Sequence, residues 1–193
     1  MKNKLTLLFA GLVALSQLQG CAVALVGATA VGVSAAQDPR SIGSQIDDQG
    51  LEMAIGKVYN QTPALAQENI SVIAYNRNIL LVGQVSEASL SRQAEEIARD
   101  TDNVDKVFNQ LRVGNQVSAT TSAHDAWLTS KVKVSLFNDD DFDSSNVKVV
   151  TENSEVFLLG KVTEDEADKA VAMARNIDGV RRVITAFTIV DHH

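Results

Sequence analysis

The residue types that most often perform covalent catalysis are scarce in this chain of 193 residues. It has one cysteine, Cys21, and three histidines, His124, His192 and His193. Serines are frequent, but none lies in the Gly-x-Ser-x-Gly elbow that presents a nucleophilic hydroxyl, and no nucleophile is paired with a base. A single cysteine also excludes an intramolecular disulfide and a Cys-x-x-Cys metal site. We therefore expect no enzyme, no small-molecule substrate and no metal-binding cofactor.

Two acidic runs could in principle bind a cation or supply paired carboxylates. An EF-hand loop that starts at Asp139 would require glycine at position 144 and glutamate at position 150, where the chain has Ser144 and Val150. We interpret residues 139–143 as a solvated turn. Residues Glu164–Glu166 open a predicted helix, where the helix dipole and the cap account for their negative charge. Neither run predicts a catalytic or calcium site.

The elements that position these residues occur twice along the chain. Residues 69–87 and 146–164 align without a gap at an offset of 146 − 69 = 77 residues, and the two copies share their apolar positions and one glycine. Such agreement indicates one structural unit built twice. The shared glycines are Gly83 and Gly160, and glycine in a strand interior weakens the strand. We therefore expect a close approach of backbone or of a helix at both glycines.

Each copy predicts the order helix, strand, strand, helix, strand. In the second copy the first two strands are Val147–Thr151 and Val156–Val162, joined by a polar turn at residues 152–155. The helix before the last strand provides a crossover, so that strands two and three can pair in parallel. The prediction is an α+β fold in which two helices cover one face of a three-stranded mixed sheet in each copy.

Helix boundaries follow from capping and breaking residues. Pro63 ends the first helix of the first copy. Ser86 is predicted to cap a helix over residues 87–102, and Thr163 with Glu166 forms a capping box for the equivalent helix of the second copy. The third strand of the first copy is predicted over Val104–Val113.

The first helix of the second copy carries an unusual outward side. Its core face is Leu128, Val132 and Leu136, which align with Leu51, Ile55 and Tyr59 of the first copy. At 100° per residue, Trp127 points about 140° away from the centre of that face. The outward side combines the only tryptophan with apolar, hydroxyl and lysine side chains: Trp127, Ser130, Lys131, Lys133, Val134 and Phe137. In the first copy Gly50, Lys57 and Asn60 replace Trp127, Val134 and Phe137, so we expect this apolar stripe only in the second copy.

An exposed apolar patch beside lysines predicts a contact surface, and three partners are compatible with it. One is a membrane, because tryptophan favours the headgroup region and lysines are attracted to an anionic surface. The second is the first copy of the repeat, against which Trp127 would pack. The third is a separate protein. The residues alone leave these alternatives open.

The beginning of the chain reads as a secretory signal peptide, with Lys2 and Lys4 before the apolar run Leu5–Leu15. The stated net charge is −7, and without these two lysines the remainder carries −7 − 2 = −9. Phosphate backbones bind basic surfaces, so this acidic remainder argues against nucleic acid as a partner. Leu18-Gln-Gly-Cys21 is similar to a bacterial lipobox, a resemblance that implies cleavage before Cys21 and a covalent lipid on it.

We accordingly divide the chain into five segments. Residues 1–20 are the signal peptide, and residues 21–47 are the lipidated cysteine with a Gly- and Ala-rich tether. The two repeats are placed at 48–113 and 124–190, joined by a Ser/Thr-rich linker at 114–123. His124 then opens the second repeat next to the linker, and His192 and His193 form a solvated tail.

The repeats resemble BON domains. The resemblance is carried by Gly83 and Gly160 after an apolar strand and by Gly179-Val180 with Val183 at the entry to the last strand, where the first copy has Asn103 in place of Gly179. Together with the lipobox, Asp38-Pro39-Arg40-Ser41 and Trp127, the chain from Cys21 to Val190 is similar to the dual-BON outer-membrane lipoproteins. The resemblance implies an outer-membrane, periplasm-facing location and binding of anionic phospholipid through the Trp127 helix. It also implies a role in envelope integrity and at the division site.

Two functions follow as hypotheses. The first is a non-enzymatic, lipid-anchored membrane-binding module in which the anchor and the Trp127 surface act together. The alternative is an adaptor whose Trp127 surface binds envelope or division proteins. Binding of lipid vesicles discriminates between them.

Overall fold

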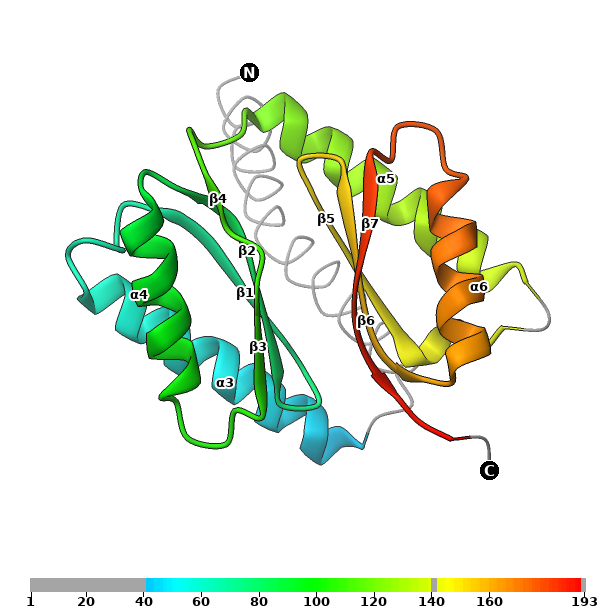
Figure 1. Cartoon of the computed structure of the whole chain (residues 1–193), viewed down its shortest axis with the longest axis horizontal. Helices are drawn as coiled ribbons and strands as arrows, with labels where there is room; N and C mark the ends of the chain where they lie inside the picture. Colours follow the sequence, from blue (N-terminus) through cyan, green and yellow to red (C-terminus); the bar gives the residue numbers. More distant parts are fainter. Residues whose placement is uncertain (1–40, 140–141, 192–193) are drawn as a thin grey trace, which may run out of the picture. The chain divides into compact units, whose positions relative to one another are not determined.

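The computed structural model describes residues 41–139 and 142–191, and they belong to one compact unit (Figure 1). The first repeat consists of α3 (Ile42–Gln61), β1 (Asn69–Tyr75), β2 (Asn78–Val85), α4 (Ala88–Arg99), β3 (Lys106–Asn109) and β4 (Arg112–Val113). Strand β2 is central: it pairs antiparallel with β1 and parallel with β3 and β4. The crossover through α4 makes this parallel pairing possible.

The second repeat has the same order. It consists of α5 (Ala119–Phe137), a 3-10 turn at η2 (Ser144–Asn146), β5 (Val147–Glu152), β6 (Glu155–Val162), α6 (Glu164–Arg175) and β7 (Arg182–Ile189). Strand β6 pairs antiparallel with β5 and parallel with β7. The predicted α+β architecture, with two helices and a mixed sheet in each repeat, is therefore confirmed.

Each repeat has its own apolar core between its helices and one face of its sheet. In the first repeat, Leu51, Ile55 and Tyr59 of α3 and Ala94 and Ala98 of α4 pack against the β2 side chains that point toward the helices. In the second, Val132 and Leu136 of α5 pack with Ala170 and Ala174 of α6 against β6. These are the helix faces that the 3.6-residue periodicity predicted.

A third apolar cluster lies on the other face of both sheets. These side chains alternate along the strands with the residues that face the helices. The buried members of the cluster are Tyr75, Leu80, Val82, Phe157, Leu159 and Ala186. The two sheets therefore share an apolar contact, and β2 and β6 are buried on both faces. This explains why both strands are almost continuously apolar rather than alternating, because most of both faces is shielded from water; Lys161 near the end of β6 is exposed.

The two glycines that the repeats share lie where another backbone comes close. A Cβ on Gly160 would lie 2.5 Å from the Asn146 carbonyl oxygen, and a Cβ on Gly83 would lie 2.0 Å from that of Asn69. Gly83 also has a φ of +121°, a conformation that L side chains rarely adopt. Only glycine fits at these points without moving the neighbouring strand.

Both first helices begin earlier than the sequence predicted. Ser41 caps α3, so residues 42–47, which were assigned to the tether, are helical. Ser118 caps α5 in the same way, so residues 119–123 of the expected linker are helical too. In each case the serine hydroxyl accepts a hydrogen bond from an amide in the first helical turn. His124 accordingly lies within α5 rather than beside a linker.

Two further boundaries differ from the predictions. The N-cap of α4 is Glu87, with no side-chain cap, because the Ser86 hydroxyl donates to Glu68 instead. The predicted strand Val104–Val113 is divided into β3 and β4, with Asn109 accepting a hydrogen bond from the amide of Leu111 at the break. Asn103 has a φ of +67° and Gly179 a φ of +98°, so the loops before the last strands both use a left-handed residue.

Candidate functional site

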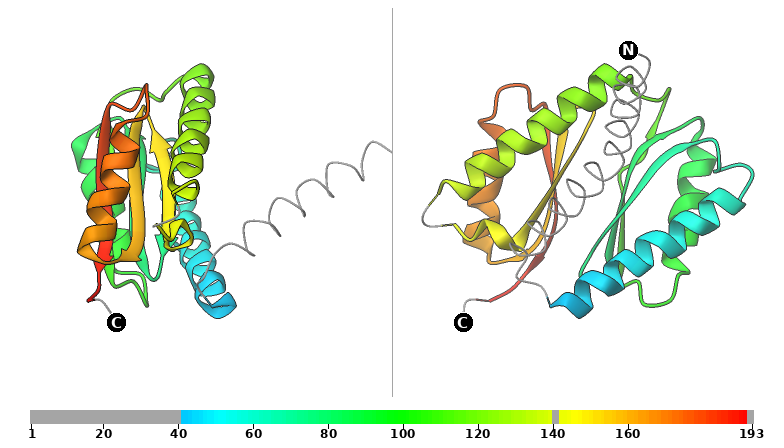
Figure 2. Two further views of the ribbon diagram at one scale, coloured as in Figure 1. Left: turned by 90° about the vertical axis from the view of Figure 1, so that its right-hand side faces the viewer. Right: turned by 180° about the vertical axis from the view of Figure 1, so that it is seen from behind.

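The outward side of α5 is exposed as the helical wheel predicted. Leu128, Val132 and Leu136 are buried, whereas Trp127 is 48% exposed, Val134 57% and Phe137 68%. Ser130, Lys131 and Lys133 are exposed as well. The left-hand view of Figure 2 shows α5 with one side turned away from the strands. We call the six residues of this side the α5 surface: Trp127, Ser130, Lys131, Lys133, Val134 and Phe137.

Trp127 is held between two neighbours on its own helix. The ring of His124 stacks on the indole with 5.5 Å between centroids and an interplanar angle of 26°. One turn further along, Lys131 Nζ lies 5.1 Å from the indole centroid, which is a cation–π contact. The spacings of three and four residues place all three side chains on one side of the helix. Trp127 is thus oriented by its neighbours while half of it remains open to solvent.

The α5 surface is free of exposed negative charge although the chain is acidic. Within α5, all of which is described, the one carboxylate is Asp125, and it is buried. Asp125 accepts hydrogen bonds from the backbone amides of Asn153 and Ser154 at 2.7 and 2.8 Å, so it stabilises the β5–β6 turn. After the helix, Asp139 forms an ion pair with Lys169 of α6 at 2.5 Å. The surface therefore presents apolar, hydroxyl and cationic groups and no carboxylate.

The structure also bears on the alternative that Trp127 packs against the first repeat. The described contacts between the repeats are made by the sheet faces and by polar links such as Tyr75 to the Asn146 carbonyl and Lys148 to Glu52. Trp127 takes part in none of those links. Among the described residues, packing between the repeats is thus made by the sheet faces and these polar links.

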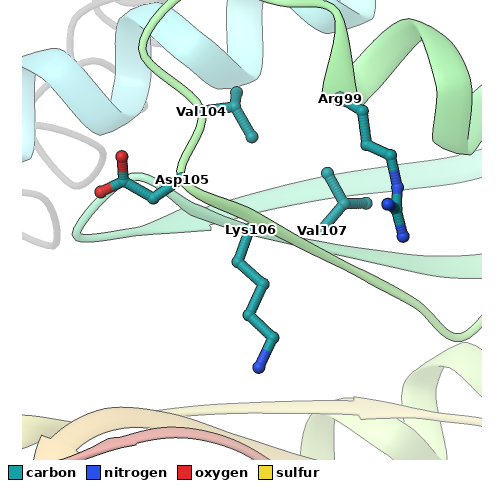
Figure 3. A pocket seen from close by; sticks show the side chains of 5 residues that line it. All are labelled: Arg99, Val104, Asp105, Lys106 and Val107. Atoms are coloured by element: carbon teal, nitrogen blue, oxygen red, sulfur yellow. The ribbon is translucent and has the colours of Figure 1, made fainter.

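The described residues line pockets of a few hundred Å³. One of about 260 Å³ lies where α4 ends and β3 begins (Figure 3), and its five side chains point in different directions rather than toward one point. Asp105 there forms an ion pair with Arg77 at 3.2 Å. The residues that line this pocket are Arg99, Val104, Asp105, Lys106 and Val107. None of them is a Ser, Cys or His that could act as a nucleophile paired with a base.

No described helix combines the length and hydropathy needed to cross a bilayer. Across residues 41–139 and 142–191, no three His, Cys, Asp or Glu side chains are grouped so that they could hold a metal ion. Cys21, His192 and His193 lie outside the described residues, so the lipidation of Cys21 stays a prediction.

Sequence reasoning missed two features of these helices. His124 was placed beside the linker because the start of α5 was set too late, although its three-residue spacing from Trp127 would have identified the contact. The second feature is that α3 also exposes large apolar side chains: Ile42 is 77% exposed, Ile46 62% and Met53 71%. The expectation that only the second repeat has an outward apolar stripe is therefore wrong.

Comparison with known proteins identifies the family. The model of the BON domain matches residues 47–115 and 124–191, which is most of the chain. The chain belongs to the BON-domain family. It is 38% identical over 175 residues to the outer membrane lipoprotein DolP of Haemophilus influenzae, covering 90% of this chain and 91% of that protein. It is thus a dual-BON lipoprotein of the DolP type, located at the outer membrane and facing the periplasm.

Two further relatives match most of the chain. The 21 kDa hemolysin of Actinobacillus pleuropneumoniae is 37% identical over 154 residues, which is 79% of each chain. The osmotically-inducible protein Y of Escherichia coli is 28% identical over 145 residues, covering 74% of this chain and 72% of that protein. The α5 surface lies in the second BON domain of this chain.

Proposed function

We propose that this lipoprotein is a non-enzymatic membrane-binding module that contacts anionic phospholipid through the α5 surface of its second BON domain. The observation that carries the proposal is a half-exposed tryptophan next to exposed Val134 and Phe137, with two lysines and no exposed carboxylate on the same helix. Aromatic rings favour the headgroup region, and lysine stems can extend their charge toward anionic headgroups. Overall acidity does not oppose this, because the local charge of the surface is positive.

A covalent lipid on Cys21 would make this contact effective. One acyl anchor holds the chain at the bilayer, and a second weak contact then becomes intramolecular, so that the two act together. The resemblance to dual-BON lipoproteins further supports a role in outer-membrane integrity and at the division site. An adaptor that binds an envelope protein through the same surface is the competing function.

The test uses vesicles and a chain that lacks residues 1–21. Trp127→Glu should lower the affinity for anionic vesicles by at least about tenfold, because the ring loses its apolar burial and the new charge is repelled by the headgroups. Folding should be retained, because water already reaches this side chain. Sedimentation with vesicles measures binding, and far-UV circular dichroism with a thermal melt checks the fold.

A matched control adds the same charge elsewhere in the second domain. Ala172 is an exposed residue of α6, and Ala172→Glu should leave binding unchanged.

Lys131→Ala should weaken binding roughly fivefold at low salt and less at high salt, because one lysine at an anionic surface contributes about 1 kcal/mol that salt screens. If Trp127→Glu folds and binds vesicles as well as the original chain, the lipid surface lies elsewhere and the adaptor function is favoured.

A further inference from the structure

The first BON domain has an unpartnered helix face of its own. Ile42, Ile46 and Met53 of α3 lie within about 40° of one another at 100° per residue, and their centre points about 160° away from the buried face of the helix. Each of the three is more than 60% exposed. Isolated apolar residues on a surface need no explanation, but three large ones lie along one side of this helix over about three turns.

The two first helices of the domains are unlike the two second helices in this respect. Helices α4 and α6 bury alanines and expose polar residues, as an amphipathic surface helix does. Helices α3 and α5 carry large apolar side chains on their outward faces as well as on their core faces. A helix with apolar side chains on both faces is normally buried on both faces. The exposed apolar side chains of α3 and α5 therefore indicate a contact surface on the outward face of each helix.

The charge around the α3 stripe fits the same kind of partner as the α5 surface. The described carboxylates of α3 are Asp47, Asp48 and Glu52, and all lie about 100° or more from the centre of the stripe. Asp48 is buried and Glu52 pairs with Lys148. The charged residue nearest the centre of the stripe is Lys57, which is exposed. In a chain that carries −9 after residue 21, a carboxylate-free apolar face with a lysine complements an anionic surface.

The position of the stripe in the chain favours a bilayer as its partner. Ile42 is the first residue of α3, and only 42 − 21 = 21 residues separate it from Cys21. A fully extended segment of that length spans at most roughly 75 Å, so a lipid on Cys21 would allow α3 to reach the bilayer that holds the lipid. A short connection of this kind raises the effective concentration of the bilayer at α3.

We infer that the Ile42, Ile46 and Met53 face of α3 is a second membrane-contacting surface, seated on the anionic bilayer that holds the lipid anchor. This inference rests on the proposed function. The aligned positions of the two helices support separate contacts: Met53 aligns with Ser130, while Gly50 aligns with Trp127. Ile42 and Ile46 align with Ala119 and Ala123, so the apolar stripe of α3 is not a copy of the α5 surface. The first domain contacts the bilayer near the tether, and the second contacts it through Trp127.

The experiment uses the mature lipoprotein reconstituted into vesicles of phosphatidylethanolamine and phosphatidylglycerol that contain lipid-borne quenchers. Acylation occupies the Cys21 thiol, so a fluorophore reacts only with an introduced cysteine. Three variants place it on α3 (Ile46→Cys), on α5 (Ser130→Cys) and, as a control, at an exposed site of α4 (Glu96→Cys). All three sites are exposed, so labelling leaves the cores intact.

We expect the fluorophore at positions 46 and 130 to lose intensity to the lipid quencher and the one at position 96 to retain it. In vesicles of phosphatidylcholine alone, the loss at both positions should diminish. Quenching at position 130 with none at 46 overturns this inference and leaves the proposed function standing. Quenching at neither position overturns both. A label at position 46 that is shielded from a soluble quencher without any lipid quenching shows that protein covers the stripe, and it overturns the inference as well.

Discussion

At the scale of single residues, the two domains depend on equivalent side chains that are separated by 77 positions. Asp48 accepts hydrogen bonds from the amides of Asn76 and Arg77, as Asp125 does from Asn153 and Ser154. The turn residues themselves have positive φ, from 46° to 64°. A carboxylate from the first helix therefore satisfies the amides of each tight turn, where they would otherwise be left without a partner inside the domain.

The glycine at the equivalent strand position gives a prediction at this scale. Gly160→Ala places a methyl group 2.5 Å from the Asn146 carbonyl oxygen, so β5 and β6 must move apart. The free energy of unfolding should fall by roughly 1–3 kcal/mol, as for other substitutions that overfill a packed site. Denaturant titration measures it.

A glycine in open space is the control for this substitution. A Cβ on Gly56 of α3 has nothing within 4 Å, so Gly56→Ala should leave stability unchanged or raise it by up to about 1 kcal/mol. Equal effects of the two substitutions would show that the close approach at Gly160 has no energetic weight.

At the scale of elements, the four long helices of residues 41–191 that the structure describes differ in how they begin. Ser41, Ser118 and Thr163 each accept a hydrogen bond from an amide of the first turn, whereas Glu87 of α4 makes no such bond. The α6 cap is reciprocal, because Glu166 also accepts from the Thr163 amide at 2.8 Å. Three negative residues in the first turn of α6 further complement its dipole.

This difference predicts unequal costs for two similar substitutions. Thr163→Ala should lower the free energy of unfolding by about 1 kcal/mol and accelerate hydrogen exchange of the Glu166 amide. Ser86→Ala, at the position that the sequence suggested as a cap, should cost less, because its hydroxyl makes a solvent-exposed hydrogen bond to the Glu68 side chain and bonds no helix amide. A larger loss from Ser86→Ala than from Thr163→Ala would contradict this assignment of caps.

At the scale of the whole described unit, the two domains are joined by an apolar contact with polar links around it. Glu155 is the central polar residue, because it pairs with Arg112 of the first domain at 2.9 Å and with Arg182 of its own domain at 2.5 Å. Burial alone would raise the pKa of the Glu155 carboxyl, but the hydrogen bonds and charges of Arg112 and Arg182 outweigh it and lower the pKa. Glu155 therefore favours the folded, joined state in its ionised form.

The direction of this pKa shift fixes how stability depends on pH. A carboxyl whose pKa is lower in the folded chain than in the unfolded chain stabilises the fold above the unfolded value, about 4.3 for glutamate. That stabilisation is lost as pH falls through the lower, folded value. Glu155→Gln should therefore lower the melting temperature at pH 7, and the difference from the original chain should shrink below about pH 4.

Thermal melts at pH 7 and at successively lower pH test this expectation. Glu96 is an exposed carboxylate of α4, and Glu96→Gln is the control that should have little effect at any of these pH values. A difference between Glu155→Gln and the original chain that persists at the lowest pH would show that shape rather than charge is responsible.

Much of this architecture was predictable because it is encoded in local patterns. The 77-residue offset identified two domains, alternating and helical periods located the strands and the core faces of the helices, and Thr163 with Glu166 marked the start of α6. The wheel placed Trp127 outside the core because Leu128, Val132 and Leu136 define which side is buried. Each of these inferences needs only the spacing of residues within one element.

Only the tertiary structure decided what the remaining apolar surfaces meet. Leu80 and Phe157 pack between the two sheets, whereas Ile42, Ile46 and Trp127 stay open to solvent, although all are apolar side chains opposite a core face. Periodicity states which residues share a face, but the partner of that face comes from elements distant in sequence. The contact of His124 with Trp127 was missed for a related reason. The start of a helix depends on one cap, and Ser118 was recognisable as that cap only once α5 was seen to begin there.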